Sequence, residues 1–133
     1  TRAAMADLPG WVERIRPKSR GYFRGPTDAL AADLDALGFE PIPAVTAACQ
    51  ALAVAVQSRR LLHPGDALLT AHVLGAKRFP VADGWRFVRR GVGHVDAAYS
   101  AAGAVHLART MPASVGRPRI LRPKSARATK SVA

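Results

Sequence analysis

A hairpin signal at Ala82-Asp83-Gly84 constrains the fold of this chain more than any other short segment. Asp-Gly between two aromatic-rich runs predicts a tight turn between antiparallel strands, which we place at residues 78–81 and 85–89. After the flexible link Gly91-Val92-Gly93, residues 95–109 predict an alanine-rich helix whose small side chains allow close packing. A strand pair followed directly by a helix predicts a domain of mixed α and β layers.

The residues before the hairpin alternate between helical and extended patterns. Helices are predicted at residues 2–15, 28–37, 47–58 and 67–74, the first of them interrupted or restarted at Pro9-Gly10. Extended segments are expected at residues 19–24, 39–45 and 60–63. The middle one is an edge strand or a connection, because two prolines remove its N–H donors.

Local signals also predict where these helices begin and end. Thr27 and Thr46 are candidate N-caps, since a hydroxyl oxygen can accept a hydrogen bond from the first free N–H groups of a helix. Gly38 and Gly75 are expected just after helix ends. Together these elements predict one α/β domain over residues 1–111, followed by a disordered tail over residues 112–133.

The charge of the chain is strongly positive. Its 133 residues carry a net charge of +11 at pH 7, from 20 Lys and Arg against nine Asp and Glu. The tail contains no acid and six of the bases, which are Arg117, Arg119, Arg122, Lys124, Arg127 and Lys130. The rest of the chain therefore carries a net charge of +5. Such a tail favours polyanions, such as nucleic acid or an acidic membrane surface, and a solubilising disordered end explains it equally well.

Cysteine and hydropathy patterns limit the class of protein. The single Cys49 excludes an internal disulfide and a Cys-rich zinc site, and its alanine-rich surroundings predict a buried structural thiol. The four histidines lack the spacing of a zinc site. No apolar run reaches the roughly 18 residues that span a membrane, and no signal peptide is evident, so we expect a cytoplasmic protein. The chain begins with Thr1, and we expect it to be a fragment of something longer.

Asp96, at the start of the last predicted helix, is the main candidate for chemistry. A carboxylate there, just after Arg89 and Arg90, is where a metal-dependent phosphodiester-cleaving site can place a ligand. A simple N-cap also explains an Asp at this position. Arg89 and Arg90 could bind the phosphates of DNA. Alternatively, their charges only keep a solvent-exposed strand edge from aggregating.

Several segments together carry a resemblance to a known family. The first is Arg24-Gly25-Pro26, before a helix that ends at Gly38. The alanine-rich helix with Cys49 and the segment Ser58-Arg59-Arg60-Leu61-Leu62-His63 follow. The last are Lys77-Arg78-Phe79-Pro80 leading to Asp83-Gly84-Trp85-Arg86-Phe87, and Arg89-Arg90 before Val95-Asp96. In this order and spacing, residues 25–108 resemble the carboxy-terminal nuclease part of phage terminase large subunits, of the kind encoded by actinobacterial phages and prophages.

The resemblance implies a ribonuclease-H-like layered fold. Three acids would hold two divalent metals, Mg²⁺ or Mn²⁺, that cut DNA during packaging of the viral genome. Carried over by position, Asp96 matches the third acid, the second falls at Tyr22, and the first precedes residue 1. No G-x-x-x-x-G-K-[ST] stretch occurs, so the ATPase half of a terminase is absent from this chain.

We therefore expect an incomplete domain, without the first strands, that does not cleave DNA alone. Its expected partners are double-stranded DNA and the terminase ATPase half, the portal or the small subunit, in the cytoplasm of a bacterial host, with no membrane. The residues expected on DNA are Arg89, Arg90, Arg117, Arg119, Arg122 and Lys124. The alternatives are a small basic nucleic-acid-binding protein without catalytic activity and a merely structural α/β domain.

Overall fold

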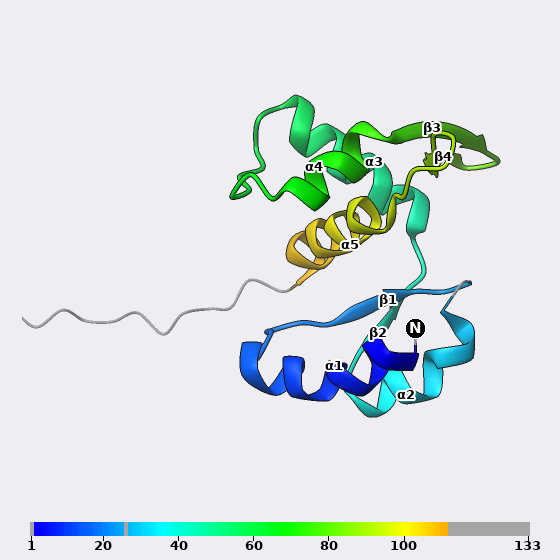
Figure 1. Cartoon of the computed structure of the whole chain (residues 1–133). Coiled ribbons are helices and arrows are strands. Elements are labelled where there is room, and N and C mark those ends of the chain that lie inside the picture. The colour runs from blue at the N-terminus through cyan, green and yellow to red at the C-terminus, as the bar shows by residue number, and fades with distance from the viewer. Residues whose placement is uncertain (1, 26, 112–133) are drawn as a thin grey trace, which may run out of the picture.

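In the computed structural model, which describes residues 2–25 and 27–111, helices and short strands form a mixed α/β domain (Figure 1). The predicted disordered tail and its basic residues lie outside this range. In chain order the elements are α1 (Arg2–Ile15), β1 (Gly21–Phe23), the 3₁₀ helix η1 (Asp28–Leu30), α2 (Ala31–Ala36), β2 (Glu40–Ile42), α3 (Val45–Gln57), α4 (Ala67–Leu74), β3 (Ala76–Val81), β4 (Gly84–Arg89) and α5 (Asp96–Thr110).

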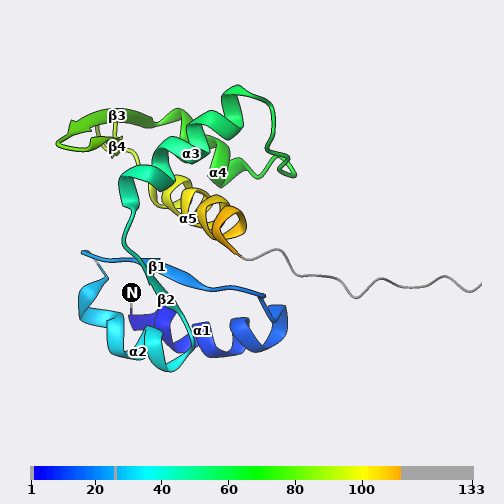
Figure 2. The same ribbon diagram turned by 180° about the vertical axis from the view of Figure 1, so that it is seen from behind.

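The strands β1 and β2 form a parallel pair in which Tyr22 lies opposite Pro41. In the described residues β1 is the one strand paired with β2, as expected for an edge strand that contains proline. Helix α5 lies on one side of this pair, and α1 and α2 lie on the other (Figures 1 and 2). The approach of α5 is close, because a Cβ built on Gly21 would come within 3.1 Å of Leu107 Cδ1.

The strands β3 and β4 form the predicted antiparallel hairpin, with Val81 opposite Gly84 across the turn. The hairpin packs on α3, which also packs along α5. Ala48, Leu52 and Ala102 form a small buried cluster where these helices meet, and Phe87 of β4 packs against it. The predicted close packing of the last helix is thus confirmed, since Ala102 is fully buried.

Of the two predicted helix caps, one is confirmed in position only and the other is wrong. Thr27 occupies the N-cap position of η1, but its hydroxyl donates to the Phe23 carbonyl oxygen and makes no cap bond to the helix. Helix α3 begins after Ala44, and the Thr46 hydroxyl, inside the helix, instead donates to Asp83 Oδ1 in the hairpin turn at 3.3 Å. Both hydroxyls therefore serve contacts between elements instead of helix ends.

Other local predictions fare differently. Helix α1 runs through Pro9 without interruption, so the expected restart is wrong. The strand expected at residues 60–63 is also wrong, because this segment is irregular and has no strand beside it. The predicted helix ends are confirmed: Gly75 follows α4, and Gly38 follows α2 with a φ of 75°, a backbone conformation that favours glycine.

Candidate functional site

Asp96 is the first residue of α5, and its carboxylate is open to solvent, with 87% of the side chain exposed. Val95, and not Asp96, occupies the N-cap position, and no side chain caps this helix from there. The capping explanation therefore does not account for this aspartate. Its negative charge does lie in the first turn, where the positive end of the helix dipole favours it.

A groove of about 1430 Å³ runs between α1 on one wall and α5 with β4 on the other. Asp96 lines this groove, and so does Tyr22, the position that the resemblance gives to the second acid. The floor between the walls contains Phe23 and Ile42 from the parallel strand pair. Of the three acid positions that the resemblance implies, two therefore line one groove, and the residue at one of these two is a tyrosine instead of an acid.

Tyr22 cannot stand in for a metal-binding carboxylate. Its hydroxyl donates to Asp35 Oδ1 at 3.1 Å, and its side chain is buried. Burial raises the pKa of this phenol above its ordinary value, and the bond to Asp35 raises the pKa further. Tyr22 therefore stays neutral at pH 7 and offers no charge that would offset a divalent cation.

The donor set around Asp96 does not fit two divalent metals. The titratable side chain within 4.0 Å of its carboxylate is that of His94, whose Nδ1 lies 3.9 Å from Asp96 Oδ2. Across residues 2–25 and 27–111, no group of three His, Cys, Asp or Glu side chains is arranged to hold a metal ion. Two-metal hydrolysis requires several carboxylates between the ions, so we assign no metal to this site.

A pair of histidines beside Asp96 is visible only in the folded chain. His72 of α4 accepts a hydrogen bond at Nδ1 from the Ala97 N–H, at 2.9 Å, and so satisfies one free donor of the first turn of α5. The rings of His72 and His94 lie 5.9 Å apart. They come from different elements, so no spacing in the sequence predicts the pair.

The two arginines predicted to contact DNA lie at the open end of the hairpin. Arg89 is the last residue of β4 and lines the groove, and Arg90 follows it with its N–H donating to the Gly75 carbonyl at 2.9 Å. Both side chains are exposed. Among the side chains that the structure describes, His94–Asp96 is the only contact within 4.0 Å between a basic and an acidic group, so no acid lies that close to either arginine.

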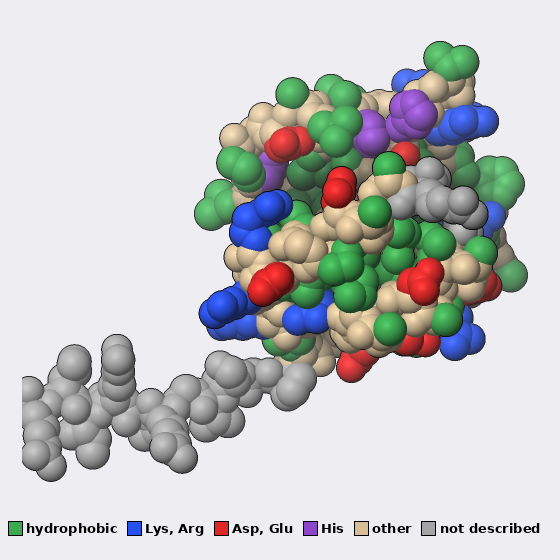
Figure 3. Space-filling model, turned by 60° about the horizontal axis from the view of Figure 1, so that its bottom comes forward, with side chains coloured by type: hydrophobic (Ala, Val, Ile, Leu, Met, Phe, Trp, Pro, Cys, Tyr) green, Lys and Arg blue, Asp and Glu red, His purple; other side chains and the backbone are tan. Residues whose placement is uncertain are grey.

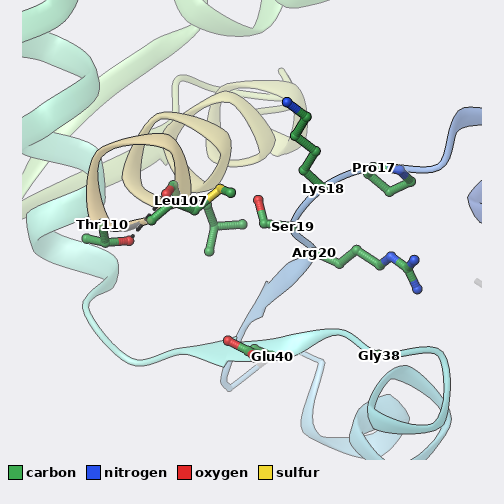
Figure 4. Close-up of a pocket in the computed structure, with 9 residues that line it drawn as sticks. Pro17, Lys18, Ser19, Arg20, Gly38, Glu40, Leu107 and Thr110 are labelled. Carbon is green, nitrogen blue, oxygen red and sulfur yellow. Dashed lines mark hydrogen bonds between the residues drawn. The ribbon is translucent and has the colours of Figure 1, made fainter. Parts of the chain in front are cut away.

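A second, smaller hollow of about 480 Å³ lies between the segment after α1, β2 and the end of α5. Lys18, Arg20 and Glu40 supply its charges (Figure 4). Figure 4 shows Arg20 directed toward Gly38, and its Nη1 donates to the Leu37 carbonyl at 2.6 Å. This arginine therefore serves the end of α2, and the hollow offers no catalytic arrangement.

The single thiol is structural, as predicted. Cys49 is fully buried in α3, and burial raises its pKa. A thiol with a raised pKa is a poor nucleophile at neutral pH, because the thiolate is the reactive form.

Comparison with known proteins identifies no relative of this chain. No protein-family model, no curated protein and no solved structure matches it. Among the described residues, no helix has the length and apolar character to cross a membrane.

Proposed function

We propose that this chain is a DNA-binding part of a terminase-type packaging nuclease, which holds double-stranded DNA and does not cut it alone. The observation that carries the proposal is the set of bases without acid partners. Arg89 and Arg90 stand exposed at one hairpin end, and no described Lys or Arg forms an ion pair with an Asp or Glu. Exposed arginines of this kind suit the phosphates of a nucleic-acid backbone.

The arrangement of layers supports a ribonuclease-H-like assignment within this proposal. A parallel strand pair has helices on both sides, which is the layering that the resemblance implies (Figures 1 and 2). Asp96 and Tyr22 both line the large groove, although the Tyr22 hydroxyl reaches Asp35 of α2, on the other side of the strand pair from α5 (Figure 1). The finer fold and the link to packaging rest on these two features together with the resemblance.

The same groove supports the non-cutting part of the proposal. Asp96 is the single carboxylate at the compared positions of this chain, since Tyr22 takes the second. One carboxylate does not balance two divalent cations. Mg²⁺ or Mn²⁺ would therefore bind weakly, and the chain is expected to retain DNA intact.

Binding to a short duplex, followed by fluorescence anisotropy over a range of salt concentrations, tests the DNA-binding part. Arg89→Ala/Arg90→Ala is expected to weaken binding and to lower the slope of log K against log salt by about 1.8, since each phosphate contact contributes about 0.9. Arg59→Ala/Arg60→Ala is the matched control, because these two arginines are also adjacent and exposed but lie after α3. Equal losses in both variants would contradict a site at the hairpin end.

Plasmid nicking in Mn²⁺ or Mg²⁺ tests the non-cutting part. We expect the plasmid to remain supercoiled. Nicking that requires Mn²⁺ and disappears in Asp96→Ala would overturn this part and favour an active nuclease.

The alternative function is that of a small basic DNA-binding protein unrelated to packaging. It predicts the same binding to DNA, but no contact with a terminase ATPase half in a pull-down.

A further inference from the structure

We propose that the groove between α1 and α5 receives an extended polypeptide segment, which adds a third strand to the free edge of β1. This inference goes beyond DNA binding and does not depend on it. It rests on the backbone of β1, on the apolar walls of the groove and on the charges around it.

The backbone of β1 presents an edge for pairing. Tyr22 lies opposite Pro41 of β2, and the Glu40 N–H donates to the Arg20 carbonyl at 3.0 Å. Alternate residues of a parallel ladder turn their N–H and C=O groups to opposite edges. Because Arg20 and Tyr22 face β2, the backbone groups of Gly21 and Phe23 point away from β2, to the side where the described residues provide no strand. The Phe23 carbonyl already accepts a hydrogen bond from the Thr27 hydroxyl, so it offers only its remaining lone pair to an added strand.

A parallel sheet of two strands is an unusual arrangement, and in the described residues both of its outer edges lack a strand. The outward residue of β2 is Pro41, which has no N–H to donate, so the edge of β1 is the better one for pairing. Parallel strands occur mainly in larger sheets that are covered on both faces, and two strands alone contribute little stability. In this chain helices lie on both sides of β1, yet the sheet stops at two strands (Figure 1). An added strand would extend the sheet within layers that already exist.

The walls of the groove indicate the side chains of this strand. Leu8 and Trp11 of α1 line one wall, and Tyr99 and Leu107 of α5 line the other. Trp11 is 43% exposed, so its indole lacks full cover. The face that carries α1 and α2 displays hydrophobic side chains among scattered charges (Figure 3). A strand between two apolar walls needs apolar side chains on both of its faces.

The size and chemistry of the groove favour a peptide over other ligands. Its volume of about 1430 Å³ exceeds the roughly 300–1,000 Å³ of small-molecule sites. A nucleic-acid strand has no alternating N–H and C=O groups to pair with the edge of β1, whereas main-chain pairing is how extended peptides bind open sheet edges.

The charges of the groove indicate how the segment ends. Four arginines line it against two aspartates: Arg20, Arg24, Arg86 and Arg89 against Asp7 and Asp96. This excess of positive charge favours acidic residues that flank the apolar core of the incoming strand. The occupant is therefore an extended apolar segment with acidic flanks.

The test uses a fluorescein-labelled synthetic peptide, Glu-Glu-Val-Ile-Val-Thr-Val-Glu-Glu, titrated with the whole chain in the absence of DNA. Two versions carry N-methyl groups at either the odd or the even core positions, which removes the donors along one edge. We expect binding of the parent peptide and a loss of at least about tenfold for one methylated version only, since one edge pairs with β1. A version with Lys in place of Glu should bind about tenfold more weakly.

A matched pair of variants locates the binding to the groove. Trp11→Lys should weaken the parent peptide by about tenfold, as loss of an aromatic anchor does. Ile15→Lys on the same helix is the control, because Ile15 is exposed and does not line the groove. If Trp11→Lys does not fold, the methylated peptides still decide the question.

Other outcomes would overturn the inference. Absence of parent-peptide binding, or equal binding of both methylated versions and the parent, would exclude strand addition. Displacement of the peptide by a thymidine oligonucleotide, with an equal effect of Trp11→Lys on both ligands, would assign the groove to single-stranded nucleic acid. Arg89 belongs to both surfaces, but the peptide titration contains no duplex and the duplex titration contains no peptide, so this inference and the proposed function fail separately.

Discussion

Gly21 lies where the parallel strand pair meets α5, and the lack of a side chain there lets the two layers touch. A Cβ at this position would lie 2.8 Å from Ile42 Cδ1 and 3.1 Å from Leu107 Cδ1. We expect Gly21→Ala to lower the free energy of unfolding by about 1–3 kcal/mol, as overpacking of a core does. Urea denaturation measures this loss. Gly10→Ala is the control, since its Cβ would meet nothing within 4 Å, and it should be neutral or slightly stabilising.

Tyr99 couples the stability of the fold to alkaline pH. Its hydroxyl donates to the Phe87 carbonyl at 2.5 Å, and burial raises its pKa above the ordinary value near 10. Above about pH 10 the unfolded phenol loses its proton while the folded one retains it, so the free energy of unfolding falls as pH rises. We expect a smaller decrease in Tyr99→Phe than in the parent, measured by urea denaturation between about pH 8 and pH 11. Equal decreases in the two proteins would contradict this linkage.

At the scale of elements, two aspartates at helix starts are expected to contribute differently to the free energy of unfolding. Asp66 caps α4, since its Oδ1 accepts from the Leu69 N–H at 2.8 Å, whereas Asp96 makes no such bond. Asp66→Ala should therefore lower the free energy of unfolding by about 1 kcal/mol. Asp96→Ala should change it by less than about 0.5 kcal/mol, as exposed substitutions usually do. A loss at Asp96 equal to that at Asp66 would restore the capping explanation of Asp96.

Elements with local causes could be predicted from the sequence, and those with distant causes could not. The turn at Asp83-Gly84 and the helix end at Gly38 depend on residues beside them, and both are confirmed. The prediction of a strand at residues 60–63 is wrong because a strand requires a second strand to pair with, and the local sequence pattern does not show whether one is present. Thr46 failed as a cap because its partner, Asp83, is 37 residues away in the chain.

The candidate site divides in the same way. The start of the last helix, and with it the place of Asp96, could be predicted from local pattern. The hydrogen bond from Ala97 to His72 could not, because it joins residues 25 apart from two different helices. Nor could the groove that Asp96 shares with Tyr22, which exists only because α1 and α5 lie on opposite sides of β1.

At the scale of the whole molecule, buried side chains and positive charge are distributed differently along the chain. The buried hydrophobic residues of the described structure lie between Val12 and Ala102. Six of the twenty Lys and Arg, however, lie beyond Pro112. This separation predicts that stability and DNA retention respond differently to loss of the tail.

Deleting residues 113–133 is expected to leave the thermal unfolding transition, measured by circular dichroism, within a few degrees of the parent, because the core is retained. Duplex affinity should fall, and the slope of log K against log salt should decrease by up to about five, since each of six phosphate contacts contributes about 0.9. A second variant with the six tail bases replaced by Gln keeps the length and should reproduce the loss of affinity. An unfolded truncation beside a folded Gln variant would show that the tail belongs to the core, and unchanged affinity in both would leave DNA binding to the domain alone.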